Sequence, residues 1–214
     1  MAVILSAGLL GQNQTEPDHL VPVPAYEHDD YGNSVFHTLI KQRLPELYMI
    51  VRPSFSVEYA VSIGSIWSEG FPKKRLRYEI EYTEAKRPIW NWKQLPGGRT
   101  SVLDIKRDTP INSVKFEIPQ QAAEQLIAAW KHVLYETKYP RNPTLGCDGT
   151  TYEFYAHYNL FGSTWSPGSG SPLLMVELGD ALVEYARSEP QTRQQILPKC
   201  IELAKKVQAY KFRE

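Results

Sequence analysis

Alternating hydrophobic and polar residues predict β-strands along the first half of the chain. The most regular stretch is residues 75–83, where Leu76, Tyr78, Ile80 and Tyr82 alternate with Arg77, Glu79, Glu81 and Thr83. This period of two predicts a strand with one buried and one solvated face. Further strands are expected at residues 47–51, 56–64 and 113–118. Residues 88–93 and 100–106 flank a Pro-Gly-Gly turn, which predicts a hairpin.

After Pro119 the hydrophobic spacing changes to that of a helix. The expected helix ends near Tyr139, because two prolines follow. Residues 151–159 predict a strand by alternation, with Phe154, Ala156 and Tyr158 on one face and Glu153, Tyr155 and His157 on the other. Ser171 and Pro172 are typical of a helix N-cap and first helical position. A last helical segment, from about Pro190 to Tyr210, should be kinked or split at Pro198.

This order of elements predicts an α+β fold: a mainly antiparallel β-sheet with about three helices packed on one face. The absence of an internal repeat or linker favours a single domain over residues 35–214. Residues 1–34 are expected to form an N-terminal arm, since prolines at positions 17, 22 and 24 exclude a regular helix there.

The apolar run from Ala2 to Leu10 has the length of a signal-peptide core and is too short to span a membrane. No basic residue precedes it, so residues 1–12 are either a signal remnant or an apolar element packed on the domain. The first alternative predicts a periplasmic or secreted bacterial protein, and the second is compatible with a cytoplasmic one. Cys147 and Cys200 should form a disulfide after export and remain buried thiols in the cytosol.

The chain carries 24 basic and 24 acidic residues. Zero net charge argues against general nucleic-acid binding, which needs a basic face. The sequence contains no phosphate loop, nucleophile elbow or metal-ligand spacing. We therefore expect neither a metal nor another cofactor, and no transmembrane segment.

Glu153 and His157 lie four positions apart on one face of a predicted strand. Their separation, about 13 Å, rules out a direct hydrogen bond but would allow them to flank a substrate. With Asp148 they form the basis of one hypothesis, a hydrolase with a dispersed active site.

Aromatic residues are frequent, with 13 tyrosines and five tryptophans. We expect Tyr155, His157 and Trp165 to be exposed contacts. Trp90 and Trp92 share one strand face and could form either a shelf for a ligand or part of the core. The leading hypothesis is a small non-enzymatic protein that binds another protein, of the immunity or inhibitor type. A structural component of a cell-envelope assembly is the other alternative to the hydrolase.

Overall fold

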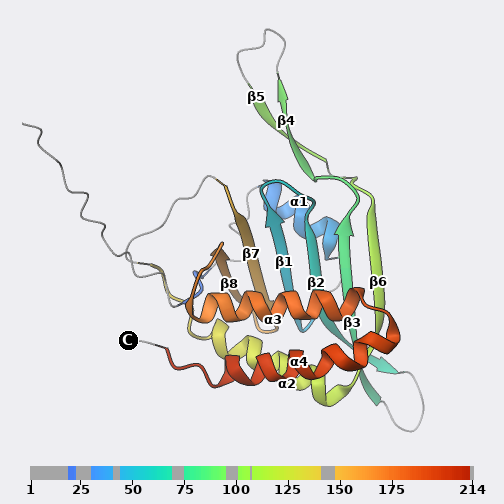
Figure 1. Ribbon diagram of the computed structural model, residues 1–214. Coiled ribbons are helices and arrows are strands. Elements are labelled where there is room, and N and C mark those ends of the chain that lie inside the picture. The colour runs from blue at the N-terminus through green and yellow to red at the C-terminus, as the bar shows by residue number, and fades with distance from the viewer. Residues whose placement is uncertain are drawn as a thin grey trace, which may run out of the picture.

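A six-stranded antiparallel sheet forms the centre of the computed structural model (Figure 1), with strand order β6-β3-β2-β1-β7-β8. The structure describes residues 19–22, 30–40, 44–68, 75–94, 101–106, 108–140 and 148–212. The sheet strands are β1 (Leu47–Pro53), β2 (Tyr59–Ser68), β3 (Arg75–Ala85), β6 (Ile111–Ile118), β7 (Thr150–Ala156) and β8 (Leu160–Trp165). Strands β4 (Trp90–Gln94) and β5 (Ser101–Ile105) form a separate hairpin that projects from one end of the sheet.

Three helices cover one face of the sheet, and a fourth lies on the other face (Figure 1). The covering helices are α2 (Gln120–Leu134), α3 (Gly170–Arg187) and α4 (Pro190–Gln208), and the fourth is α1 (Asp30–Leu39). The expected α+β class with a mainly antiparallel sheet is confirmed. The described residues differ from the expectation by one helix, since α1 begins inside the segment expected to be an extended arm.

The main core lies between the sheet and helices α2, α3 and α4. The buried face predicted for β3 is confirmed, since Tyr78, Ile80 and Tyr82 lie in this core. Helix α3 approaches the sheet closely at Gly179: a Cβ atom there would lie 2.2 Å from Sδ of Met49 in β1. Glycine therefore sets the spacing between α3 and the sheet at this point.

A second core lies between the sheet and α1. Val35 and Leu39 of α1 pack in it with Tyr48 and Ile50 of β1 and with Tyr155 of β7. The central strands β1 and β7 are therefore buried on both faces. On the face of β7 that was expected to be solvated, Glu153 and Tyr155 are buried, and Tyr155 belongs to the second core.

Two expected helix boundaries are wrong. Helix α2 ends at Leu134 and not near Tyr139. The N-cap of α3 is Ser169, so Ser171 and Pro172 lie buried within the first turn of the helix. Helix α4 runs without a break from Pro190 to Gln208 with Pro198 inside it, so of the two outcomes expected at this proline, a kink or a split, the helix is not split.

The turn between β7 and β8 contains residues 157–159. Tyr158 and Asn159 both have positive φ, 76° and 58°. Asparagine tolerates this left-handed region, but in a tyrosine the Cβ crowds the backbone. The turn therefore holds an aromatic residue in an unfavourable conformation.

Candidate functional site

The three residues of the hydrolase hypothesis are spread along β7. Asp148 precedes the strand, Glu153 lies within it and His157 follows it. Nine positions of extended chain span about 30 Å, so Asp148 and His157 lie near opposite ends of β7. The fold does not bring the three together around one substrate.

Glu153 instead belongs to a buried polar cluster beside α1. It is 6% exposed and accepts a short hydrogen bond from Nη2 of Arg52 in β1. The Arg52 guanidinium lies 5.4 Å from the ring centroid of Tyr31. The Tyr31 hydroxyl donates to Oε1 of Glu58 at 2.8 Å. These contacts connect α1 with strands β1 and β7.

Glu58 is fully buried, and its carboxylate receives a further donor from the chain just before β4. The backbone N–H of Ile89 donates to Oε1 at 3.2 Å and to Oε2 at 3.0 Å. Burial, and then the neighbouring Glu58 carboxylate, raise the pKa of Tyr31 above its ordinary value. Because both carboxylates are held by donors from other elements, the cluster fastens α1 and the β4–β5 hairpin to the sheet.

The exposure expected for Tyr155 is wrong. Its side chain is 1% exposed and stacks on Tyr48 with ring centroids 4.9 Å apart. His157 and Trp165 are exposed, as expected. They lie at opposite ends of the β7–β8 hairpin, His157 in the turn and Trp165 at the end of β8. The three residues therefore do not form one surface.

The tryptophan pair lies in strand β4. Trp90 is half-buried and contacts Tyr31 edge to face, with centroids 6.0 Å apart, so this residue packs against α1. The side chain of Trp92 lies outside the described part of the structure.

Cys200 lies in the main core with 0% exposure. Burial raises the pKa of its thiol to about 12. Cys147 lies outside the described residues, so the pairing of the two cysteines stays a prediction.

The most exposed tyrosines described lie around the C-terminal end of α2 and the β7–β8 turn. Tyr135, Tyr139 and Tyr158 are 65%, 70% and 72% exposed. The Lys131 ammonium lies 5.0 Å from the ring centroid of Tyr158, and the Tyr135 N–H donates to the Lys131 carbonyl one helical turn away. The centroids of the His157 and Tyr158 rings lie 4.4 Å apart. We call Lys131, His157 and Tyr158, whose side chains contact one another, the tyrosine patch.

The alternation predicts that Tyr158 continues the strand on the same face as Phe154 and Ala156. The strand ends at Ala156, and the side chain of Tyr158 is exposed in the turn. Asn159, a residue that accepts positive φ, was the signal that could have placed a turn here. The patch also depends on α2 lying beside this turn, which the sequence pattern does not reveal.

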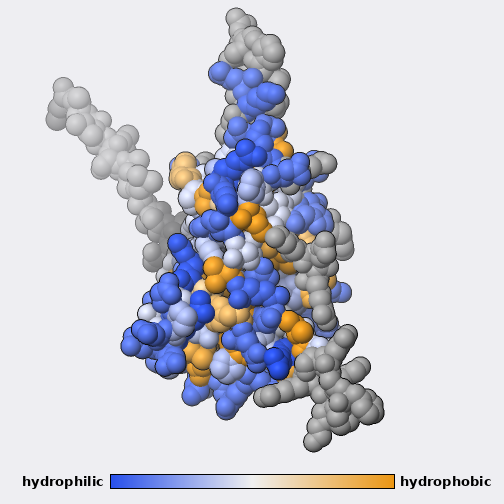
Figure 2. Space-filling view, turned by 90° about the vertical axis from the view of Figure 1, so that its right-hand side faces the viewer, coloured by the Kyte–Doolittle hydropathy of each residue, from blue (hydrophilic) through white to orange (hydrophobic). Residues whose placement is uncertain are grey.

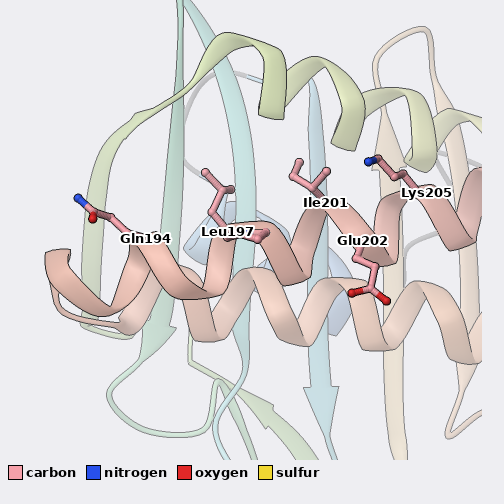
Figure 3. Close-up of a pocket in the computed structure, with 6 residues that line it drawn as sticks. Gln194, Leu197, Ile201, Glu202 and Lys205 are labelled. Atoms are coloured by element: carbon pink, nitrogen blue, oxygen red, sulfur yellow. The ribbon is translucent and has the colours of Figure 1, made fainter.

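An apolar groove runs along α4 where it faces α2 (Figure 3). It has a volume of about 540 Å³ and is lined by Gln194, Leu197, Pro198, Ile201, Glu202 and Lys205. Leu197 and Ile201 point toward α2, and Glu202 points away from it. The ionisable side chains of this lining are Glu202 and Lys205, and Glu202 is paired with Lys206 at 3.0 Å. The groove could accept an apolar group but offers no acid–base pair for catalysis.

Within the described ranges, no three histidine, cysteine or acidic side chains come together to hold a metal ion. No helix in that part of the chain is long and apolar enough to cross a membrane. No protein-family model, curated protein or solved structure matches this chain.

Proposed function

We propose that the protein is a small non-enzymatic binding protein that contacts another protein through the tyrosine patch. The observation that carries the proposal is Tyr158, a residue that is 72% exposed and has a φ of 76°. An unfavourable backbone conformation costs roughly 1–3 kcal/mol and is concentrated at functional sites. An exposed aromatic residue therefore occupies a position where asparagine or glycine would adopt the same backbone conformation at a lower energetic cost.

The chemistry of the patch suits a protein partner. Tyrosine combines a large apolar ring with a hydroxyl, and it is enriched among residues that dominate binding energy. Lys131 and His157 add hydrogen-bond donors beside the Tyr158 ring. A partner surface with carboxylates or carbonyl oxygens around an apolar depression would fit these groups. An immunity or inhibitor role is the form of binding that we propose.

The experiment is affinity capture from a lysate of the source cells, with the tagged full chain as bait and mass spectrometry of the retained proteins. One protein should be recovered near equal stoichiometry. Tyr158→Asn should weaken its binding by about 30-fold, since a central aromatic contact contributes about 2 kcal/mol. Thermal unfolding would verify that the variant is folded.

Phe55→Ala is the matched control. Phe55 is 84% exposed and lies in the β1–β2 loop, at the opposite end of the sheet from the β7–β8 turn. Its replacement should leave the binding unchanged. Equal retention of the same partner by the wild type and by Tyr158→Asn would contradict the proposed surface.

We further propose that the protein is exported to the periplasm or secreted. The proposal rests on the apolar run from Ala2 to Leu10. Cell fractionation should find the protein outside the cytoplasm, with the N-terminal segment removed. Full-length protein found only in the cytoplasm would contradict export and leave the binding proposal unaffected.

A further inference from the structure

The two edges of the sheet differ in what borders them. At β8, Val21 forms a bridge with Ser163, with N–H···O distances of 2.9 and 2.8 Å in the two directions. At the opposite edge, β6 pairs with β3 over eight consecutive residues. No other described strand borders the outer side of β6. An open, regular edge can accept another strand, and proteins usually shield such edges.

Between Val114 and Glu117, the side chains of β6 are apolar on one face and charged on the other. On the helix side, Val114 is 40% exposed, and Phe116 is partly covered by Tyr185 and Arg193. On the opposite side, the side chains of Lys115 and Glu117 are 49% and 60% exposed. Figure 2 shows the molecule from the side at which β6 forms the edge of the sheet, and apolar residues lie among polar ones across the middle of this view.

This pattern is complementary to itself in one antiparallel register. We propose that β6 pairs with β6 of a second copy about a two-fold axis at Phe116. Lys115 then lies opposite Glu117 of the second copy, and the reciprocal pair forms on the other side of the axis. Val114 lies opposite Ile118 of the second copy, which places apolar residues together on the helix side. Such cross-strand pairs stabilise a sheet.

Neighbouring registers are less favourable. Moving the axis to Lys115 places the two lysines opposite each other, and like charges in that position are destabilising. Moving it to Val114 places Lys115 opposite Ser113 and Asn112 opposite Phe116. Of these three registers, only the one with its axis at Phe116 places opposite charges across from each other and apolar residues across from apolar residues.

The proposed dimer joins the two six-stranded sheets into one, with the main helix layers on the same side. It also extends charge pairs already present within one copy. Lys115 contacts Glu79 at 2.5 Å, and Glu117 contacts Arg77 at 3.5 Å. The pairing covers Val114–Ile118 of each copy, so the interface is small and the dimer should be weak and concentration-dependent.

Reversing the charges of Lys115 and Glu117 distinguishes an effect on dimerisation from an effect on folding. Lys115→Glu or Glu117→Lys alone places like charges opposite each other at both symmetric positions, and each should weaken dimerisation by about tenfold or more. The double variant K115E/E117K restores opposite charges across the axis. Its dimerisation constant should return to within about threefold of the wild type. Its monomer should be the least stable, because each new charge meets a like charge on Glu79 or Arg77.

Sedimentation velocity over a range of protein concentrations measures the monomer–dimer equilibrium, and thermal unfolding measures folding. A wild-type protein that stays monomeric at every concentration would overturn the proposal. So would a double variant that dimerises no better than the single ones. Assembly beyond the dimer would overturn it as well, because a two-fold pairing is closed.

Cysteine cross-linking tests the register without changing any core residue. In a Cys147→Ser background, Lys115→Cys protein mixed with Glu117→Cys protein should form a disulfide-linked heterodimer under mild oxidation. Either variant alone should cross-link at least about tenfold less, since directly opposed residues lie within disulfide reach and shifted ones do not. Equal cross-linking of the single and mixed samples would exclude this register.

Discussion

The thiol of Cys200 lies in the main core without exposed surface, and burial raises its pKa to about 12. At pH 8 only about one thiol in 10⁴ would be ionised, and the thiolate is the reactive form. We predict that Cys200 does not react with an aromatic disulfide reagent in the folded protein and reacts at once in denaturant. A Cys147→Ser variant isolates the signal. Modification of the folded protein within minutes would contradict the buried position.

Asp180 of α3 has a pKa above its ordinary value, because of partial burial and the nearby Glu177. Its charged form therefore disfavours the folded state at pH 7. The penalty is absent below the pKa of the unfolded chain and is complete above the raised folded pKa. We predict that Asp180→Asn raises the melting temperature at pH 7 and has a smaller effect at pH 4. Circular dichroism melts at both pH values measure this, and an equal shift at both would refute the electrostatic cause.

At the scale of elements, Gly179 controls how closely α3 packs on the sheet. Alanine in place of an ordinary helix glycine stabilises by about 1 kcal/mol, but here its Cβ would lie 2.2 Å from Sδ of Met49. Overpacking of a core costs about 1–3 kcal/mol. We predict that Gly179→Ala lowers the free energy of unfolding by about 1–2 kcal/mol, measured by urea titration.

The matched control for Gly179 is the same substitution in a Met49→Ala background. With the methionine removed, Gly179→Ala should be neutral or stabilising, because only the helix propensity remains. A Gly179→Ala loss of the same size in both backgrounds would show that the Met49 contact is not its cause.

The β7–β8 turn gives the second prediction at this scale. Tyr158→Asn places a residue that tolerates positive φ where tyrosine is unfavourable. It also removes the contact with Lys131, which contributes about 0.5–1 kcal/mol. We predict that the variant is as stable as the wild type or up to about 1 kcal/mol more stable, by urea titration. A variant that loses stability would indicate that Tyr158 serves the fold, and not a partner.

Patterns within one element predicted most of the sheet and the three larger helices. The alternation in β3 and the helical spacing of α2 each reflect a single face of one element. The burial of Tyr155 could not be predicted in this way, since it depends on the second core, which brings in Tyr48 and α1 from far away in the sequence. Tyr158 and Tyr135 were missed for a different reason: each is exposed because its strand or helix ends just before it, and periodicity alone does not locate such ends.

At the scale of the whole molecule, burial holds many tyrosines in the un-ionised form. It raises the pKa of eight of them: Tyr31, Tyr48, Tyr59, Tyr78, Tyr82, Tyr152, Tyr155 and Tyr185. Because the unfolded chain loses these protons near pH 10, each tyrosine stabilises the fold below that pH, and this contribution falls as the pH rises further.

We predict that unfolding above about pH 11 is cooperative and coincides with the ionisation of the buried tyrosines. Ultraviolet difference absorbance at 295 nm follows ionisation, and circular dichroism follows the fold. The two transitions should superimpose for the buried group. Complete ionisation of all tyrosines while the fold persists would contradict the burial described.

The position of β1 at the centre of the sheet has a consequence for the newly made chain. One neighbour of β1 is β2, which follows directly, but the other is β7, and Arg52 of β1 is 101 positions from its ion-pair partner Glu153 of β7. Ribosomes add about 5–20 residues per second, so roughly 5–20 s pass between the synthesis of β1 and the synthesis of β7. During this interval an apolar strand edge is open to other nascent chains. Synthesis, more than the finished fold, is therefore the stage at which this protein would depend on chaperones.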